Sequence, residues 1–214
     1  MQLRCSAFLF DLDGVLVDSR AVVERVCREW ARRHSLDPDR VLRIAHGRRT
    51  RDTVKAVAPH LDIGREVAWL DAAELADVEG LREVPGVRQF LATLPAGSWA
   101  VVTSCGRALA RLRLTSVGLP VPEIVVTSDD VSHGKPAPDG YQLGAKRLGQ
   151  DTAACVVFED APPGIAAGRA AGAPVIALRT THPDADFSGA AAIIPDFAGL
   201  RARRDHDGYV VTIR

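Results

Sequence analysis

The stretch SAFLFDLDG, residues 6–14, decides the fold. A short apolar run that stops at two carboxylates and a glycine is typical of a buried parallel strand ending in a loop. The pattern returns around Val101, Val125, Val157 and Ile176, and each of these runs ends in polar residues. Helix-length segments separate the runs, at residues 86–94, 107–117, 139–148 and 165–171. The alternation predicts an α/β protein with a Rossmann-like, doubly wound parallel sheet.

Residues 18–80 interrupt this alternation. Their apolar residues recur at helical spacing, as at Val22, Val26 and Trp30, and no strand-like alternation occurs there. We therefore expect a core of residues 1–17 plus 81–214 with an inserted helical cap over residues 18–80.

Composition excludes several classes of protein. The chain has 214 residues, 47% of them hydrophobic, and its 27 basic residues balance 27 acidic ones. A nucleic-acid binder usually has a basic excess, and a disordered chain combines high charge with low hydrophobicity. Neither description matches, so we expect a globular protein that binds no nucleic acid.

The cysteines and apolar runs bear on the protein's location. Cys5, Cys27, Cys105 and Cys155 are widely spaced and form no zinc or redox motif, which favours free thiols in a reducing compartment. No apolar run approaches the roughly 18 residues of a membrane span. We expect no membrane partner and a cytoplasmic location.

Polar side chains follow the predicted strands. In chain order they are Asp11, Asp13, Thr103, Ser104, Lys135, Glu159 and Asp160. Ligands bind at the carboxyl ends of the strands in such sheets. The carboxylates could form an oxygen cage for Mg²⁺, with one aspartate as nucleophile and the other moving a proton. The hydroxyls could bind phosphate oxygens, and the lysine offers a compact positive charge. Together these residues indicate phosphoryl transfer.

Each motif alone has a structural alternative. Asp-x-Asp-Gly is often a turn, Glu159-Asp160 could cap the next helix, and Gly-Lys-Pro could be a surface turn. Residues 103–106 could be a plain helix start. Four such elements at strand ends of one sheet favour the functional interpretation.

Four segments resemble the motifs of the haloacid dehalogenase superfamily, in the family's order and spacing. They are FDLDGVLVDS (10–19), VVTS (101–104), GKPAPDGY (134–141) and FEDAPPGIAAGRAAG (158–172). The helical insertion resembles the superfamily's C1-type cap in position. HGRRTRDTV (46–54) is similar to the branch of sugar-phosphate and glycerol-phosphate phosphatases.

The resemblance implies roles for the carboxylates. Asp11 would be the nucleophile that forms an aspartyl-phosphate and would also bind Mg²⁺. Asp13 would be the general acid and base, and its backbone carbonyl would be a metal ligand. Asp160 would be the third protein ligand, with Glu159 binding the metal directly or through water.

The resemblance also implies a phosphate site. Thr103 would hydrogen-bond the phosphoryl group, helped by Ser104, and Lys135 would neutralise charge on Asp11 and the phosphate. Cys105 departs from the family, where a glycine or small polar residue is common, and this puts in doubt the local shape of the loop.

The cap contains a basic stretch, residues 40–55, with six basic residues against one acidic residue. We expect His46, Arg48 or Arg49 to contact the substrate, while Gly47 lets the loop approach closely. The alternative is a solvated helix face. No aromatic side chains are interleaved with the basic ones, which argues against nucleic-acid binding.

These observations predict a Mg²⁺-dependent phosphatase that hydrolyses small phosphorylated sugars or polyols, as a monomer or homodimer. One alternative is a phosphomutase of the β-phosphoglucomutase type, which would hold a second phosphate in the cap. Another is a non-catalytic protein that binds a phosphorylated metabolite.

Overall fold

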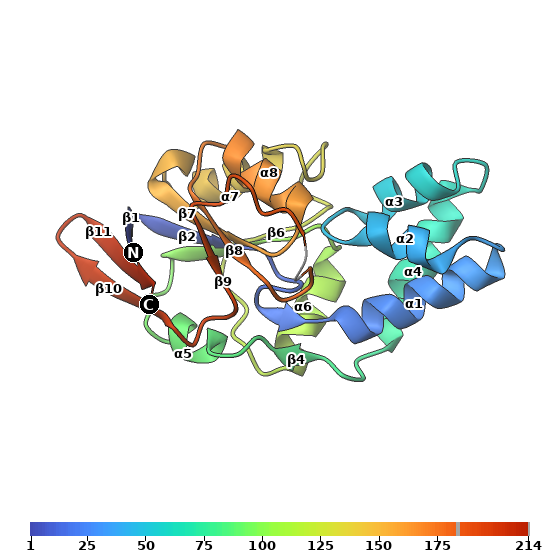
Figure 1. Ribbon diagram of the computed structural model, residues 1–214, viewed down its shortest axis with the longest axis horizontal. Coiled ribbons are helices and arrows are strands. Elements are labelled where there is room, and N and C mark those ends of the chain that lie inside the picture. Colours follow the sequence, from blue (N-terminus) through green and yellow to red (C-terminus); the bar gives the residue numbers. More distant parts are fainter. Residues whose placement is uncertain (183–184, 214) are drawn as a thin grey trace.

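The computed structural model describes residues 1–182 and 185–213. Within these residues, the centre is a six-stranded parallel sheet with strand order β6-β5-β2-β7-β8-β9 (Figure 1). The strands are β2 (Ala7–Phe10), β5 (Trp99–Val102), β6 (Val125–Val126), β7 (Cys155–Glu159), β8 (Val175–Leu178) and β9 (Ala192–Ile194). The predicted α/β fold is confirmed. The sequence did not predict β9, which has only three residues.

Helices cover both faces of this sheet. They are α5 (Val87–Leu91), α6 (Arg107–Ser116), α7 (Asp139–Arg147) and α8 (Pro162–Ala170), with a short 3₁₀ helix, η1 (Thr152–Ala154), before β7. Along β2, Phe8 and Phe10 point to the core shared with α5 and α6, whereas Ala7 and Leu9 point to the core shared with α7 and α8. Because both faces are covered, β2 is buried along its whole length and reads as a continuous apolar run.

A small antiparallel sheet joins the two ends of the chain. Its strands are β1 (Gln2–Cys5), β10 (Leu200–Asp205) and β11 (Gly208–Ile213), in the order β1-β11-β10. Gln2 pairs with Thr212, and Figure 1 shows this sheet at the end of the molecule opposite helices α1 to α4. The sequence did not predict it, because such distant pairing leaves no local pattern.

Residues 18–80 contain α1 (Arg20–Arg33), α2 (Pro38–Ala45), α3 (Thr50–Val57) and α4 (Ile63–Ala76), which are called the cap helices below. They lie between β3 (Val17–Asp18) and β4 (Arg82–Glu83), which pair antiparallel. Their apolar faces form a separate core that contains Trp30, Val54 and Leu70. Helix α4 also contacts α6, so the cap helices lie against the sheet domain (Figure 1).

Two further features concern the chain as a whole. Cys5, Cys27, Cys105 and Cys155 are free thiols. A helix with the length and apolar character needed to cross a membrane is not found in the described part of the chain.

Candidate active site

Neighbouring strands bring the predicted motifs to one edge of the sheet. Asp11 follows β2, Thr103 follows β5, and Glu159 is the last residue of β7. The Asp11 backbone N–H donates to the Phe158 carbonyl over 3.0 Å, and the Thr103 N–H donates to the Val126 carbonyl over 2.9 Å. The loops that hold the site are therefore fixed by hydrogen bonds to adjacent strands.

Asp11, Glu159 and Asp160 form a buried carboxylate cluster. One oxygen from each lies within 4.8 Å of the others, and the three residues are 4%, 0% and 3% exposed. Lys135 Nζ lies 2.7 Å from Asp11 Oδ1 and 2.6 Å from Glu159 Oε1. Three carboxylates against one ammonium leave two negative charges in excess. This buried, oxygen-only donor set fits a hard divalent cation such as Mg²⁺.

The pKa values of the cluster also favour a bound cation. Burial raises the pKa of Asp11 to about 7, with Lys135 opposing the shift and Glu159 and Asp13 adding to it. Burial, together with Glu159 and Asp11, raises the pKa of Asp160 well above its ordinary value. Burial would lower the pKa of Lys135, but the carboxylates of Asp11 and Glu159 outweigh it and raise that pKa. The carboxylates thus ionise at a cost that a bound cation would offset.

The Glu159 carboxylate is already heavily engaged. Its Oε1 accepts a hydrogen bond from the Tyr141 hydroxyl at 2.7 Å and faces Lys135. Its Oε2 accepts from the backbone N–H groups of Asp160, at 2.9 Å, and Ala161, at 3.3 Å. Glu159 therefore orients Lys135 and the loop that carries Asp160.

Asp13 is held by contacts that the sequence did not predict. Its Oδ1 accepts a hydrogen bond from Ser19 at 2.7 Å, and its Oδ2 accepts from Arg113 Nη1 at 2.6 Å. Arg113 lies on α6, is 3% exposed, and pairs through Nη2 with Glu74 on α4. A charged residue on the apolar face of segment 107–117, beside Leu114, was the signal in the sequence that could have identified it.

Gly14 allows the loops of the two motifs to meet. Its φ is +77°, and a Cβ there would collide with the Asp160 carboxylate and the Thr181 hydroxyl. The Thr180 hydroxyl donates to the Gly14 carbonyl over 2.5 Å. A side chain at position 14 would therefore displace the Asp160 carboxylate from its present position.

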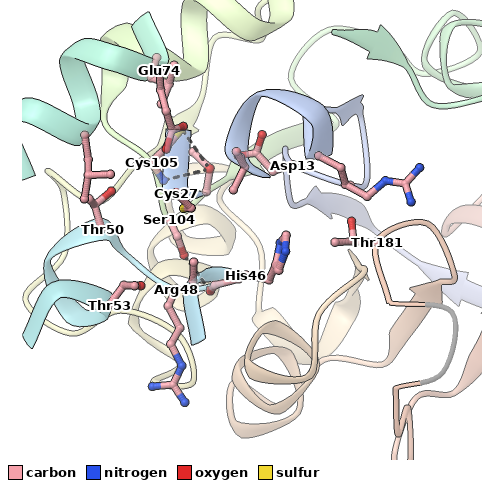
Figure 2. Close-up of a pocket in the computed structure, with 18 of the residues that line it drawn as sticks. Asp13, Cys27, His46, Arg48, Thr50, Thr53, Glu74, Ser104, Cys105 and Thr181 are labelled. Carbon is pink, nitrogen blue, oxygen red and sulfur yellow. Dashed lines mark hydrogen bonds between the residues drawn. The ribbon is translucent and has the colours of Figure 1, made fainter. Parts of the chain in front are cut away.

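A cavity of about 90 Å³ lies between this edge of the sheet and the cap helices (Figure 2). The predicted residues that line it are Asp11, Asp13, Thr103, Ser104, His46, Arg48 and Asp160. Trp30, Val41 and Leu70 supply apolar surface from the cap helices. The candidate catalytic groups and an apolar wall of the cap helices therefore line the same cavity.

The predicted cap residues differ in where they point. The His46 ring lies 4.8 Å from that of His182, centroid to centroid. Burial lowers the pKa of His46 to about 4, so its ring is neutral near pH 7. The Arg48 side chain extends away from Asp13 in Figure 2.

Gly47 and two predicted substrate ligands instead bridge the cap helices and the sheet domain. The Gly47 carbonyl accepts a hydrogen bond from Ser104 Oγ at 3.1 Å, and a Cβ on Gly47 would lie 2.7 Å from Ala161 Cβ. Arg49 pairs with Asp52 at 2.7 Å and donates to the Ser132 carbonyl at 3.0 Å. Gly47 thus permits the expected close approach, whereas the Ser104 and Arg49 side chains make contacts within the protein.

Known proteins are similar to this chain over the region that contains these motifs. The model of the haloacid dehalogenase-like hydrolases matches residues 5–172. Hexitol phosphatase A of Escherichia coli (strain K12) is 45% identical over 181 residues, which cover 82% of this chain and 84% of that protein. Glycerol-1-phosphate phosphohydrolase 2 of Saccharomyces cerevisiae is 36% identical over 200 residues, which cover 87% of this chain and 79% of that protein.

Solved structures share the fold. A hydrolase from Pseudomonas syringae superposes with a TM-score of 0.77 at 26% sequence identity. The match covers 88% of this chain and 92% of that one.

Proposed function

The chain belongs to the haloacid dehalogenase-like hydrolases and is a phosphoric monoester hydrolase, and on this premise we propose that it releases phosphate from small phosphorylated polyols or sugars. The observation that carries the proposal is the buried cluster of Asp11, Glu159 and Asp160 with Lys135, of which Asp11 and Asp160 line a cavity beneath the cap helices. The hexitol and glycerol phosphatases among its relatives support the choice of substrate class.

In the first step, an Asp11 carboxylate oxygen attacks the phosphorus atom and forms an aspartyl-phosphate. The bond from phosphorus to the ester oxygen breaks, and protonated Asp13 donates its proton to the departing alkoxide. Lys135 stabilises the ionised Asp11 carboxylate and the phosphoryl oxygens next to it, while Thr103 binds the phosphoryl group.

In the second step, water attacks the phosphorus atom of the aspartyl-phosphate and Asp13 accepts its proton. The bond from phosphorus to the Asp11 oxygen breaks, which frees phosphate and restores Asp13 to its protonated form. Ser19 and Arg113 donate to the two Asp13 oxygens and so hold the ionised carboxylate, which is the form that accepts the proton in this step.

Asp11, Asp160 and the backbone carbonyl of Asp13 would hold Mg²⁺. When bound, the cation neutralises charge on the phosphoryl oxygens and helps to orient them for in-line attack. Glu159 would contribute directly or through water, in addition to positioning Lys135. Residues 18–80 would form a cap that excludes bulk water from the reaction.

Mg²⁺ is expected to stabilise the protein, and increasingly so as the pH rises. Without the cation, Asp11 has a folded pKa of about 7, above its ordinary value of about 3.9. The folded state therefore binds more protons than the unfolded state between these values, and the free energy of unfolding falls as the pH increases. Mg²⁺ binds the ionised form, so its stabilisation grows from about pH 5 to pH 8, reaching about 2.7 kcal/mol at a hundredfold excess over Kd.

Thermal unfolding with and without Mg²⁺ across this pH range measures the effect. Asp160→Asn should remove most of the Mg²⁺-induced shift, whereas the exposed Asp207→Asn should keep it. A shift that is equal in both variants would contradict the assignment of this cluster as the metal site.

A substrate panel tests the function itself. The purified protein with Mg²⁺ is expected to release phosphate from hexitol phosphates and glycerol phosphate with higher kcat/KM than from nucleotides or phosphoglycolate. The reverse preference would refute the substrate class. Interconversion of sugar phosphates without net phosphate release would instead indicate a phosphomutase.

A further inference from the structure

Thr53 on α3 carries a buried hydroxyl that has no hydrogen-bond partner among the described residues. The residue is 4% exposed and lines the cavity between the cap helices and the sheet edge. Figure 2 shows its side chain directed into that cavity. A buried hydroxyl without a partner costs free energy, so its presence calls for a ligand that satisfies it.

Two other hydroxyls that line the cavity, those of Thr50 and Ser104, are satisfied within the protein. Thr50, on the same helix, donates to Asp71 Oδ1 over 3.3 Å. Ser104 donates to the Gly47 carbonyl over 3.1 Å. Thr53 alone of these three keeps both its donor and its acceptor capacity for a molecule in the cavity.

The wall around Thr53 suits a neutral carbon chain with hydroxyl groups. Trp30, Val41 and Leu70 line the same cavity and offer apolar surface to C–H groups. A lone water would need two to four polar partners to remain at such a position. A polyol chain brings both kinds of group, since each of its carbons carries a C–H face and a hydroxyl.

The charges of the cavity argue against a second phosphate. Arg113 is paired with Asp13 and Glu74, and Arg20 is paired with Asp18. The third arginine of the lining, Arg48, extends away from Asp13 in Figure 2. A second phosphate beside Arg113 or Arg20 would have to displace their carboxylates, which is costly in a buried site. The cavity thus fits the uncharged leaving group of a monophosphate ester, with the ester oxygen near Asp13.

We propose that Thr53 determines specificity, and that its hydroxyl forms a hydrogen bond with a hydroxyl group of the polyol leaving group. This inference rests on the proposed function, because it assigns the substrate's leaving group to the cap side of that same site.

Binding measured without turnover tests the inference. In an Asp11→Asn background with Mg²⁺, Kd is measured by calorimetry for sorbitol 6-phosphate and for inorganic phosphate. Thr53→Val keeps the shape but removes the hydroxyl, so the ratio of the two Kd values should move about tenfold against sorbitol 6-phosphate. Thr53→Ser retains a hydroxyl and should keep the wild-type ratio. Thr115→Val, on exposed α6 surface, is the matched control and should also keep it.

Stability supplies a second readout that a merely structural threonine would not give. Thr53→Val removes an unsatisfied buried group, so without ligand its unfolding midpoint should rise by about 2–4 °C. An unchanged Kd ratio in Thr53→Val, an equal loss in Thr53→Ser, or a lowered midpoint would overturn the inference. Failure of the wild-type protein to release phosphate would overturn the proposed function instead, whatever the Kd ratio.

Discussion

Asp11→Asn is expected to reduce phosphate release by about 10⁴-fold or more, because the amide cannot attack phosphorus as a carboxylate does. Asp11 follows the central strand, is 4% exposed, and faces Lys135 Nζ at 2.7 Å. Glu159 does not replace Asp11 as the nucleophile, since its carboxylate is committed to Tyr141 and to backbone donors. Steady-state phosphate release from a hexitol phosphate measures the loss.

Two comparisons make the Asp11 result interpretable. Asp207→Asn, an equally conservative change at an exposed position, should keep wild-type turnover. Cooperative unfolding of Asp11→Asn would show that the fold survives. If Asp11→Asn kept more than about one hundredth of wild-type turnover, the aspartyl-phosphate mechanism on this residue would be wrong.

Arg113→Met is expected to lower the free energy of unfolding by about 3–5 kcal/mol, because it leaves two carboxylates without their buried cation. The Arg113 side chain is 3% exposed and bridges Asp13 to Glu74, whose side chain is 12% exposed. Asp13 would also lose one of the contacts that position it, so kcat should fall by about 10²-fold. Urea unfolding and steady-state kinetics measure the two effects.

Arg107→Met on the same helix is the matched control. Arg107 also pairs with a carboxylate, that of Asp130 at 2.6 Å, but its side chain is 56% exposed. Exposed pairs contribute only about 0–1 kcal/mol, so this variant should unfold almost like the wild type. Equal losses of stability in the two variants would show that the buried ion pairs of Arg113 with Asp13 and Glu74 contribute no more to the free energy of unfolding than an exposed pair does.

The sheet was predictable because it depends on local patterns. Buried parallel strands form continuous apolar runs, and β2, β5, β7 and β8 each have one. The short β9 and the pairing of β1 with β11 were missed, since three residues carry little periodicity and the partners lie at opposite ends of the chain.

The candidate site also has features that could be predicted from the sequence and features that could not. Asp11, Glu159 and Asp160 could be placed together because parallel strands end at one edge of a sheet, and the structure gathers them within 4.8 Å. The contacts of Ser104 and Arg49 could not be foreseen. Which hydroxyl or guanidinium the loop between α2 and α3 contacts depends on how the cap helices pack against the sheet, and this packing cannot be predicted from neighbouring residues in the sequence.

The sequence by itself determined the α/β class, the family and the strand-end motifs, because each rests on residues that are close together in the chain. Only the tertiary structure decided that Arg113 binds Asp13, a partner 100 residues away, and that the Thr53 hydroxyl has no hydrogen-bond partner among the residues that the structure describes. Burial makes these two facts matter: away from water, a charge requires a counter-charge and a hydroxyl requires a hydrogen bond. Whether a side chain is buried, and beside what, is settled when the cap helices and the sheet domain come together.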